Sequence, residues 1–388
     1  MILYITVAAV TVLLAGLVDN HPTRQPHRLT RQQLCNRVCL PAIFMILFLL
    51  SACRLNVGND YAKYVEFMHL VNCNAYVPTE IGFNLLVKLI YGLSGYENFL
   101  LVFAVYAFVT VFVFLLAMYE QSDEFPLTFF LFMTLGYYFQ TFSTVRYYLA
   151  LAVALYSMKF VLRRQWGRFL VLILLGAAFH KSLLVVIPLY FLASLPWKKW
   201  QLAIAALFCT TFLFLQDFYL KVVVFLYPTY EDTEYLEGGT SYINILRCAA
   251  VLIFAGIVWW LQKKESGSEI KNDESVIIKK KNLLGDRRFW FYLYLNLGAL
   301  VLYVFCSFLP IISRIGYYLT VSQILFLPML LQRVEDKRWR RLFRVGILCA
   351  AVLYFAMYLK KASGDGVLIL PYRTFFFNDM VDILSDVN

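Results

Sequence analysis

Four cationic side chains stand at the ends of long apolar stretches or inside them, namely Arg146, His180, Lys181 and Arg314. Charge at membrane depth is unfavourable by several kcal/mol unless it faces a wet cavity or an ionic partner. Guanidinium and ammonium groups bind phosphate, and an imidazole exchanges protons close to neutral pH. These residue types therefore predict an anion-binding site with a proton acceptor at the edge of a membrane.

The elements that carry these residues are predicted to be membrane-spanning helices. The chain has 388 residues, of which 61% are hydrophobic, 18% aromatic and 15% charged, so it is not an ordinary soluble domain. We expect an all-α polytopic membrane protein with about twelve transmembrane helices and a single transmembrane domain over 1–388. The apolar runs are 1–18, 38–53, 98–119, 126–141, 147–162, 168–180, 182–195, 201–216, 243–261, 289–307, 315–332 and 342–358. The first has no basic segment before it and is expected to stay as a span.

Basic residues in short loops predict the orientation of the spans, because such loops remain in the cytoplasm. They gather at 24–37, 163–168, 198–199, 262–288 and 333–344. All five groups fall on one side of the membrane only if the chain between 163–168 and 198–199 forms two short helices hinged at His180. The segment 262–288 is polar without an apolar face, which predicts a flexible basic linker between two halves. Because most of the net charge of +11 then lies in short loops, we expect no nucleic-acid partner.

The same topology leaves three larger segments outside the cell, which are 54–97, 217–242 and the tail 359–388. The first contains a helix-like stretch from Tyr61 with an apolar stripe and a second, shallow helix over 81–93. Both are suited to lying at the membrane interface. The second segment is acidic and rich in glycine, a composition typical of a mobile loop. Chemistry is expected on this outer side.

The sequence gives no sign of a metal or nucleotide cofactor. Its eight cysteines and four histidines do not have zinc-ligand spacing, and no glycine-rich phosphate loop occurs. Most cysteines are therefore expected to be packing residues. Cys53 and Cys73 share the predicted outer side, where a disulfide between them is one alternative.

Short motifs spread over residues 50–380 give the chain a resemblance to a known family. In order they are Arg54 with Gly58-Asn-Asp60-Tyr61, Glu80-Ile-Gly82-Phe83, Thr144-Val-Arg146, Phe179-His180-Lys181-Ser182 with Pro188-Leu-Tyr190, Ser313-Arg314-Ile315 with Tyr317-Tyr318, and Pro371-Tyr372-Arg373. By their order, spacing and common outward placement, the chain resembles the EpsG family of Wzy-like polysaccharide polymerases. Asn59 and Tyr147 depart from the family pattern, which often has Thr and a polar residue or Gln there.

The resemblance implies a GT-C-like fold and a glycosyltransferase that acts at the outer face of the bacterial cytoplasmic membrane. Such a polymerase joins oligosaccharide repeat units, carried on a polyprenyl diphosphate such as undecaprenyl diphosphate, into a capsule, exopolysaccharide or O-antigen chain. The implied partners are this lipid-linked oligosaccharide, the lipid bilayer and a protein that regulates chain length. No cofactor is implied.

The residues themselves fit a diphosphate substrate. Spans that begin near Arg146, Lys181 and Arg314 run inward, so each has a cation in the first turn at its outer end, where the helix dipole also favours anions. We expect Arg146 and Arg314 to stabilise the leaving diphosphate, assisted by Arg54 or Arg247. Lys181 and Arg373 complete the predicted diphosphate-binding set, the latter on the strength of the resemblance.

The expected general base is His180, which would accept the proton of the attacking sugar hydroxyl. Asp60 and Glu80 are the alternative bases and enter mainly through the resemblance, since acidic residues in an outer loop are usually just solvated. Plainer interpretations remain for the other residues: Arg146 and Arg314 as side chains that reach the interface at span ends, and His180 as a hinge residue bonded to a carbonyl.

Other functional classes are compatible with buried cations. A lipid-linked oligosaccharide transporter needs them too, but its charges usually line a path through the bilayer, whereas these gather near one face. A membrane acyltransferase that uses His180 is expected to draw its donor from the cytoplasm, against the predicted outward placement. A glycan ligase of the same glycosyltransferase class is the remaining alternative, which product length separates from a polymerase.

Overall fold

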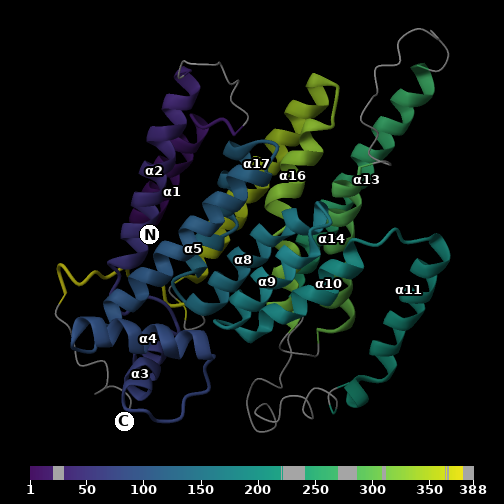
Figure 1. The fold of residues 1–388 in the computed structure, drawn as a ribbon. Coiled ribbons are helices and arrows are strands. Elements are labelled where there is room, and N and C mark those ends of the chain that lie inside the picture. The colour runs from purple at the N-terminus through teal and green to yellow at the C-terminus, as the bar shows by residue number, and fades with distance from the viewer. Residues whose placement is uncertain are drawn as a thin grey trace. The chain divides into compact units, whose positions relative to one another are not determined.

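A computed structural model describes residues 1–20, 30–219, 221, 241–269, 286–307, 312–362, 364 and 367–378, which are mainly helical (Figure 1). The chain forms two compact units. Unit 1 comprises Met1–Lys159, Gly167–Leu184 and Glu335–Asn388, and unit 2 comprises Phe160–Trp166 and Val185–Val334. Each unit is described by itself, and the single transmembrane domain expected over 1–388 stays a prediction.

Seven helices among the described residues are long and apolar enough to cross a membrane, which supports a polytopic membrane protein. They are Arg31–Ala52, Phe99–Gln121, Val145–Leu162, Tyr242–Lys263, Arg287–Phe305, Arg314–Gln332 and Lys337–Lys361. Each of the twelve predicted apolar runs contains helix, but the others are shorter. The expectations of about twelve spans and of a GT-C-like fold therefore stay predictions.

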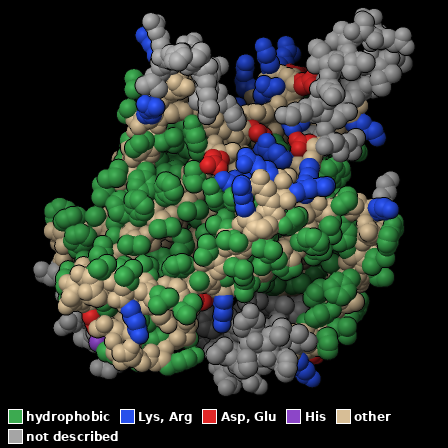
Figure 2. Space-filling model, in the orientation of Figure 1, with side chains coloured by type: hydrophobic (Ala, Val, Ile, Leu, Met, Phe, Trp, Pro, Cys, Tyr) green, Lys and Arg blue, Asp and Glu red, His purple; other side chains and the backbone are tan. Residues whose placement is uncertain are grey.

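The spans expose many apolar side chains. On α5 (Phe99–Gln121), Phe108 and Phe112 are 48% and 49% exposed, and on α17 (Lys337–Lys361) Leu353 is 64% exposed. Hydrophobic side chains also cover much of the face drawn in Figure 2. A soluble protein rarely exposes apolar surface on this scale, whereas lipid tails cover it in a bilayer.

Unit 1 contains ten α-helices, counted over the described residues. They are α1 (Ile2–Gly16), α2 (Arg31–Ala52), α3 (Tyr61–Asn72), α4 (Ile81–Ser94), α5, α6 (Phe125–Thr134), α7 (Tyr137–Gln140), α8 (Val145–Leu162), α9 (Trp166–Ala177) and α17. Side-chain caps define several starts: Thr30 and Gln33 form a capping box on α2, and Asn98 accepts the Leu101 N–H at 3.0 Å on α5. The predicted run 126–141 is divided between α6 and α7 at Gly136, whose φ of +79° favours glycine.

One end of unit 1 gathers basic residues. There α2 begins, α5 and α8 end and α17 begins, and polar contacts join these ends to one another. Arg344 on α17 binds the Glu124 carboxylate at 2.8 and 2.9 Å, and Lys159 on α8 binds Glu120 at 2.5 Å. The opposite end carries the end of α2, the start of α8, and α3 and α4, which lie together (Figure 1).

Helices α3 and α4 pack through apolar faces onto α5 and α8. The predicted stripe on α3 is present, and its residues Tyr61, Tyr64, Val65 and Met68 are at most 7% exposed. They face the protein core rather than an interface. Helix α4 has two apolar faces: one is buried, and the other exposes Ile81, Leu85, Leu89 and Leu93 by 60–80%. The shallow helix expected over 81–93 is thus present, and its exposed stripe suits an interfacial position.

The tail expected over 359–388 is folded onto unit 1 wherever it is described. Helix α17 continues to Lys361, and 367–374 then pairs with the segment after α2: Leu55 N–H donates to the Arg373 carbonyl at 3.0 Å, and Gly58 N–H to the Leu368 carbonyl at 2.9 Å. An isolated β-bridge joins Arg54 and Thr374. Residues 379–388 lie outside the described residues.

Unit 2 contains six α-helices among the described residues. They are α10 (Val186–Ala193), α11 (Lys199–Phe214), α13 (Tyr242–Glu269), α14 (Arg287–Phe305), α15 (Ile312–Thr320) and α16 (Gln323–Gln332). The short 3₁₀ helix η1 (Lys181–Val185) belongs to unit 1 except for its last residue. Of the linker expected over 262–288, α13 covers the residues up to Glu269 and α14 those from Arg287, whereas 270–285 lie outside the described residues. Helices α13 and α14 pack on each other within unit 2. The loop expected over 217–242 lies mostly outside the described residues.

The predicted helix break at His180 is confirmed. Helix α9 ends at Ala177 and η1 begins at Lys181, so 169–195 is not one long helix. This break leaves His180 in a turn at the end of α9, where its side chain can face neighbouring segments.

Candidate active site

The predicted residues Glu80, Arg146, His180 and Lys181 meet at one carboxylate in unit 1. The Arg146 guanidinium forms an ion pair with Glu80 Oε2. His180 Nδ1 lies 3.4 Å from Oε1, and the Lys181 backbone N–H donates to the same oxygen at 3.0 Å. The three side chains are only 12–15% exposed, so these charges interact in a partly desolvated site.

Local structure explains how this cluster forms. Glu80 directly precedes α4, Arg146 lies in the first turn of α8 and His180 follows α9. The start of α4 lies against the turn after α9, where Gly82 N–H donates to the Ala178 carbonyl at 2.7 Å. A Cβ on residue 82 would lie 2.6 Å from that carbonyl oxygen, so this approach requires glycine.

Aromatic rings hold Arg146 in place. Its guanidinium carbon lies 5.4 Å from the centre of the Tyr64 ring and 5.2 Å from that of Phe83, within cation–π range. These rings come from α3 and α4, so one side chain joins three helices. Arg146 is therefore more than a residue that ends a span at the interface.

The Glu80 carboxyl is held in its ionised form. Burial raises its pKa, but the contact with His180, the charge of Arg146 and the Lys181 N–H together outweigh burial and lower the pKa to about 2. Glu80 therefore carries a negative charge throughout the neutral range. A carboxylate with so low a pKa is a weak proton acceptor, which favours a positioning role for it.

The same contact assigns the tautomer of His180. An ionised carboxylate only accepts hydrogen bonds, so the ring nitrogen that faces it, Nδ1, is the one that carries the proton in neutral histidine. Nε2 is then the basic nitrogen. Both ring nitrogens are buried and form no hydrogen bond with the described residues, so the 3.4 Å approach of Nδ1 to Glu80 is an ion-pair contact, and Nε2 has no charged neighbour of this kind. The Tyr147 ring packs edge-on against the imidazole, with ring centres 5.7 Å apart.

Tyr64, Phe83 and Tyr106 are site residues that sequence reasoning missed. The hydroxyl of Tyr106 on α5 is buried and has no hydrogen-bond partner within the described part of the chain. Its ring centre lies 6.2 Å from those of Phe83 and Phe179. In a chain with 18% aromatic residues, no local signal separates these rings from packing residues, although Phe83 lies in a motif that carries the resemblance.

Asp60 lies at the border of this cluster. It precedes α3, and its carbonyl accepts the Tyr64 N–H at 2.9 Å. Burial raises the pKa of the Tyr64 hydroxyl, Arg146 lowers it, and the Asp60 carboxylate raises it. The Tyr64 hydroxyl is therefore subject to the charges of both Asp60 and Arg146.

Arg54 has different neighbours. It is 1% exposed, and its guanidinium donates to the Ser51 carbonyl and to Ser51 Oγ. The rings of Phe103, Phe142 and Tyr61 surround it at 5.1, 5.3 and 5.9 Å. Burial lowers the pKa of Arg54, and two of its nitrogens have no hydrogen-bond partner in the described residues. In this conformation a diphosphate has no direct access to Arg54.

Of the other predicted cations, Arg373 belongs to unit 1, and Arg247 and Arg314 belong to unit 2. Arg373 is exposed in unit 1, and only its backbone pairs with the segment of Arg54. Arg247 on α13 lies in unit 2 with its guanidinium carbon 6.0 Å from the Tyr317 ring. Arg314 is exposed on α15, three residues before Tyr317 and therefore adjacent to it on the helix surface. The Lys181 side chain is exposed, and it is its backbone that meets Glu80.

No group of His, Cys, Asp and Glu side chains in the described part of the chain is arranged to hold a metal ion. All eight cysteines are free, so Cys53 and Cys73 do not form the disulfide considered as an alternative.

A family model described as the EpsG family matches residues 37–374. This stretch includes all nine residues predicted for the site, the whole of unit 2 and most of unit 1. No curated protein and no solved structure matches the chain.

Proposed function

This chain belongs to the EpsG family, and from that premise we propose that it is a polysaccharide polymerase of the cytoplasmic membrane that joins oligosaccharide repeat units carried on a polyprenyl diphosphate. The observation that carries the proposal is the cluster in which Glu80 holds Arg146 and His180 together. It supplies an anion-binding group beside a proton acceptor, as transfer from a diphosphate requires.

In the proposed reaction, a hydroxyl oxygen of the acceptor unit attacks the anomeric carbon of the donor. A new C–O bond forms, and the bond between that carbon and the diphosphate oxygen breaks. The hydroxyl proton moves to His180 Nε2, and the lipid diphosphate leaves with the bonding electrons. Proton transfer to a positioned base of this kind typically accelerates a reaction by roughly 100-fold to 10,000-fold.

The charge of the cluster changes in the direction that this step needs. Arg146 and Glu80 neutralise each other, so the three side chains carry no net charge while His180 is neutral. When His180 takes the proton, the cluster gains one positive charge as negative charge develops on the leaving diphosphate. Glu80 stabilises the imidazolium, and Arg146 faces the developing anion.

Unfilled hydrogen-bonding groups support a substrate site here. Arg146 Nε, His180 Nε2 and the Tyr106 hydroxyl are buried without a hydrogen-bond partner among the described residues. Buried polar groups are nearly always paired in folded proteins, so these atoms of Arg146 and His180, which both contact Glu80, and of Tyr106, whose ring lies beside Phe83, favour a polar ligand that completes them. We assign Asp60 and Arg54 supporting roles, and Lys181, Arg247, Arg314 and Arg373 to contacts with the diphosphate or glycan.

The location of the cluster supports an outward-facing site. It lies at the end of unit 1 opposite the basic contacts of Arg344 and Lys159, and basic loop residues are retained in the cytoplasm. The donor diphosphate would then be used at the outer membrane face, and the product would be a capsule, exopolysaccharide or O-antigen chain.

The test uses purified protein in nanodiscs with a defined polyprenyl-diphosphate repeat unit and no nucleotide sugar, and products are separated by size. We expect a polymer ladder from the wild type and at least about a 100-fold slower reaction for Arg146→Ala and His180→Ala. Lys88→Ala, which removes an exposed cation from α4, is the matched control and should keep wild-type activity.

Each other outcome contradicts part of the proposal. A single addition to a different acceptor without a ladder identifies a ligase, and movement of the lipid-linked substrate across the membrane without new bonds identifies a transporter. A full ladder from His180→Ala at normal protein level overturns the base assignment.

A further inference from the structure

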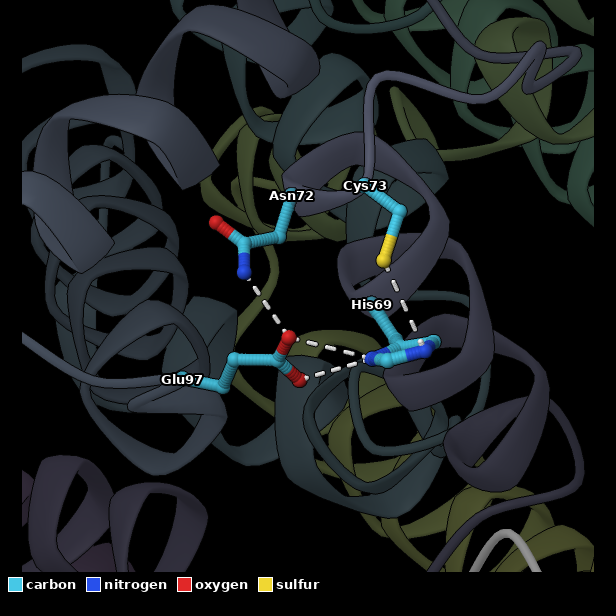
Figure 3. A network of polar contacts seen from close by, with 4 residues as sticks. All are labelled: His69, Asn72, Cys73 and Glu97. Carbon is cyan, nitrogen blue, oxygen red and sulfur yellow. Dashed lines mark hydrogen bonds and ion pairs between the residues drawn. The ribbon is translucent and has the colours of Figure 1, made fainter.

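A second polar cluster lies at the C-terminal end of α3, outside the site around Glu80. Figure 3 shows its four residues, His69, Asn72, Cys73 and Glu97. Cys73 Sγ lies 3.7 Å from His69 Nε2, and His69 Nδ1 lies 3.0 Å from each oxygen of the Glu97 carboxylate. Asn72 Nδ2 donates to Glu97 Oε1 at 2.8 Å and fixes the position of that carboxylate.

The chain geometry makes this arrangement persistent. His69 is in the last turn of α3 and Cys73 caps the helix, so the two are four residues apart and share one face. Glu97 comes from the segment between α4 and α5, directly before Asn98, which caps α5. Each of the three groups is therefore anchored to the end of a helix.

The hydrogen-bonding capacities of the groups assign the protons. Because the Glu97 carboxylate only accepts, the nitrogen that faces both of its oxygens, His69 Nδ1, carries the proton of the neutral imidazole. His69 Nε2 is then an acceptor, and it faces the Cys73 thiol. A thiol next to a basic imidazole that a carboxylate orients is the arrangement of an activated nucleophile.

This thiol is also accessible to reagents. Cys73 and Cys349 are the two exposed cysteines of the chain, and Cys349 lies within the span formed by α17. The His69 and Glu97 side chains are 39% and 37% exposed, so a small molecule reaches the sulfur from solution. No metal accounts for the cluster, because no metal-binding group occurs in the described part of the chain.

We propose that Cys73 is a reactive thiol that forms mixed disulfides with low-molecular-weight disulfides. His69 Nε2 takes the thiol proton, and the thiolate attacks one sulfur of the disulfide. A new S–S bond forms to Cys73 while the original S–S bond breaks, and the other half leaves as a thiolate that takes the proton back from His69. Cys73 is oxidised and the attacked disulfide is reduced, so electrons and protons balance.

Helix α3 connects Cys73, the site of the proposed modification, to the site around Glu80. Nine residues, or about 13 Å along the helix axis, separate Cys73 from Tyr64, whose ring packs on Arg146. The two clusters share no residue, and the inference does not rest on the proposed glycosyl transfer.

The test follows the reaction of full-length protein in detergent with the neutral disulfide 4,4′-dithiodipyridine at pH 7.4, read by the absorbance of the released thiopyridone. We expect one fast-reacting thiol per chain, absent from Cys73→Ser and present in Cys349→Ser. The rate at Cys73 should fall at least about tenfold in His69→Gln, which keeps a polar side chain but removes the base, and less in Glu97→Gln.

A second readout does not depend on the folding of those variants. Wild-type protein incubated with oxidised glutathione should carry one glutathione on Cys73, located by mass spectrometry of its peptides and removed by a reductant. An unchanged fast phase in His69→Gln, a fast phase that persists in Cys73→Ser, or glutathione on other cysteines before Cys73 would overturn the proposal. Since no glycan substrate is used, these results are independent of the polymerase assay.

Discussion

Glu80 organises the proposed active site because groups from two other segments bind its carboxylate. It accepts the Lys181 N–H, contacts His180 and forms an ion pair with Arg146. Replacing it with glutamine keeps the shape but removes the charge that orients the imidazole and compensates the guanidinium. Removing one partner of a buried ion pair destabilises a protein more than replacing both partners, because the remaining charge stays buried without compensation.

The first prediction concerns pH. The pKa of Glu80 is lowered from 4.5 to about 2 in the folded protein, so its interactions stabilise the fold fully above pH 4.5 and are lost as the pH falls through about 2. We expect the unfolding temperature of the wild type to exceed that of Glu80→Gln at neutral pH, and the difference to shrink between these two values. Calorimetry of both proteins in detergent measures it, and a difference that does not depend on pH would contradict the assignment.

At the scale of elements, the contact between the start of α4 and the turn after α9 positions Glu80 against His180. It depends on Gly82, since a Cβ there would lie 2.6 Å from the Ala178 carbonyl oxygen. This carbonyl belongs to the backbone and cannot rotate away as a flexible side chain would. The contact therefore limits the residue type at 82 to glycine.

We predict that Gly82→Ala destabilises the protein by about 1–3 kcal/mol and lowers polymerase activity by separating Glu80 from His180. Gly92→Ala is a matched control on the same helix, because nothing lies within 4 Å of the added Cβ, and it should be neutral or stabilising. Thermal unfolding and the ladder assay measure both variants. Equal behaviour of the two would show that the close contact does not matter.

At the scale of the whole molecule, the two ends of unit 1 differ in charge. Helix α17 begins with the basic residues Lys337, Arg338, Arg340, Arg341 and Arg344, whereas the opposite end carries the Glu80 cluster and α3. Because basic loops are retained in the cytoplasm, the Glu80 end is expected outside. The proposed reaction requires this orientation, because the lipid-linked donor is used at the outer face of the membrane.

The corresponding prediction is that a membrane-impermeant maleimide labels Cys73 in intact, reductant-treated cells. A cysteine introduced as Lys337→Cys in a Cys73→Ser background should react only after the membrane is permeabilised. Gel-shift labelling before and after permeabilisation measures both. Labelling of both positions in intact cells, or the reverse pattern, would rule out the proposed orientation of unit 1.

The sequence alone determined the helical class, the membrane environment, the break at His180 and membership of the EpsG family, since apolar runs, interrupting charges and ordered motifs are local features. It also named the members of the Glu80 cluster as separate candidates. It did not show that α13 extends to Glu269, into the predicted linker.

Only the tertiary structure decided which candidates meet. Glu80 lies 66 residues from Arg146 and 101 from Lys181, and such distances in sequence place no limit on distance in space. The structure joined these residues through the contact at Gly82, enclosed Arg54 among aromatic rings, and placed Arg247 and Arg314 in the other unit. The physical reason is that packing between helices, unlike the formation of each helix, depends on side chains that are far apart in the chain.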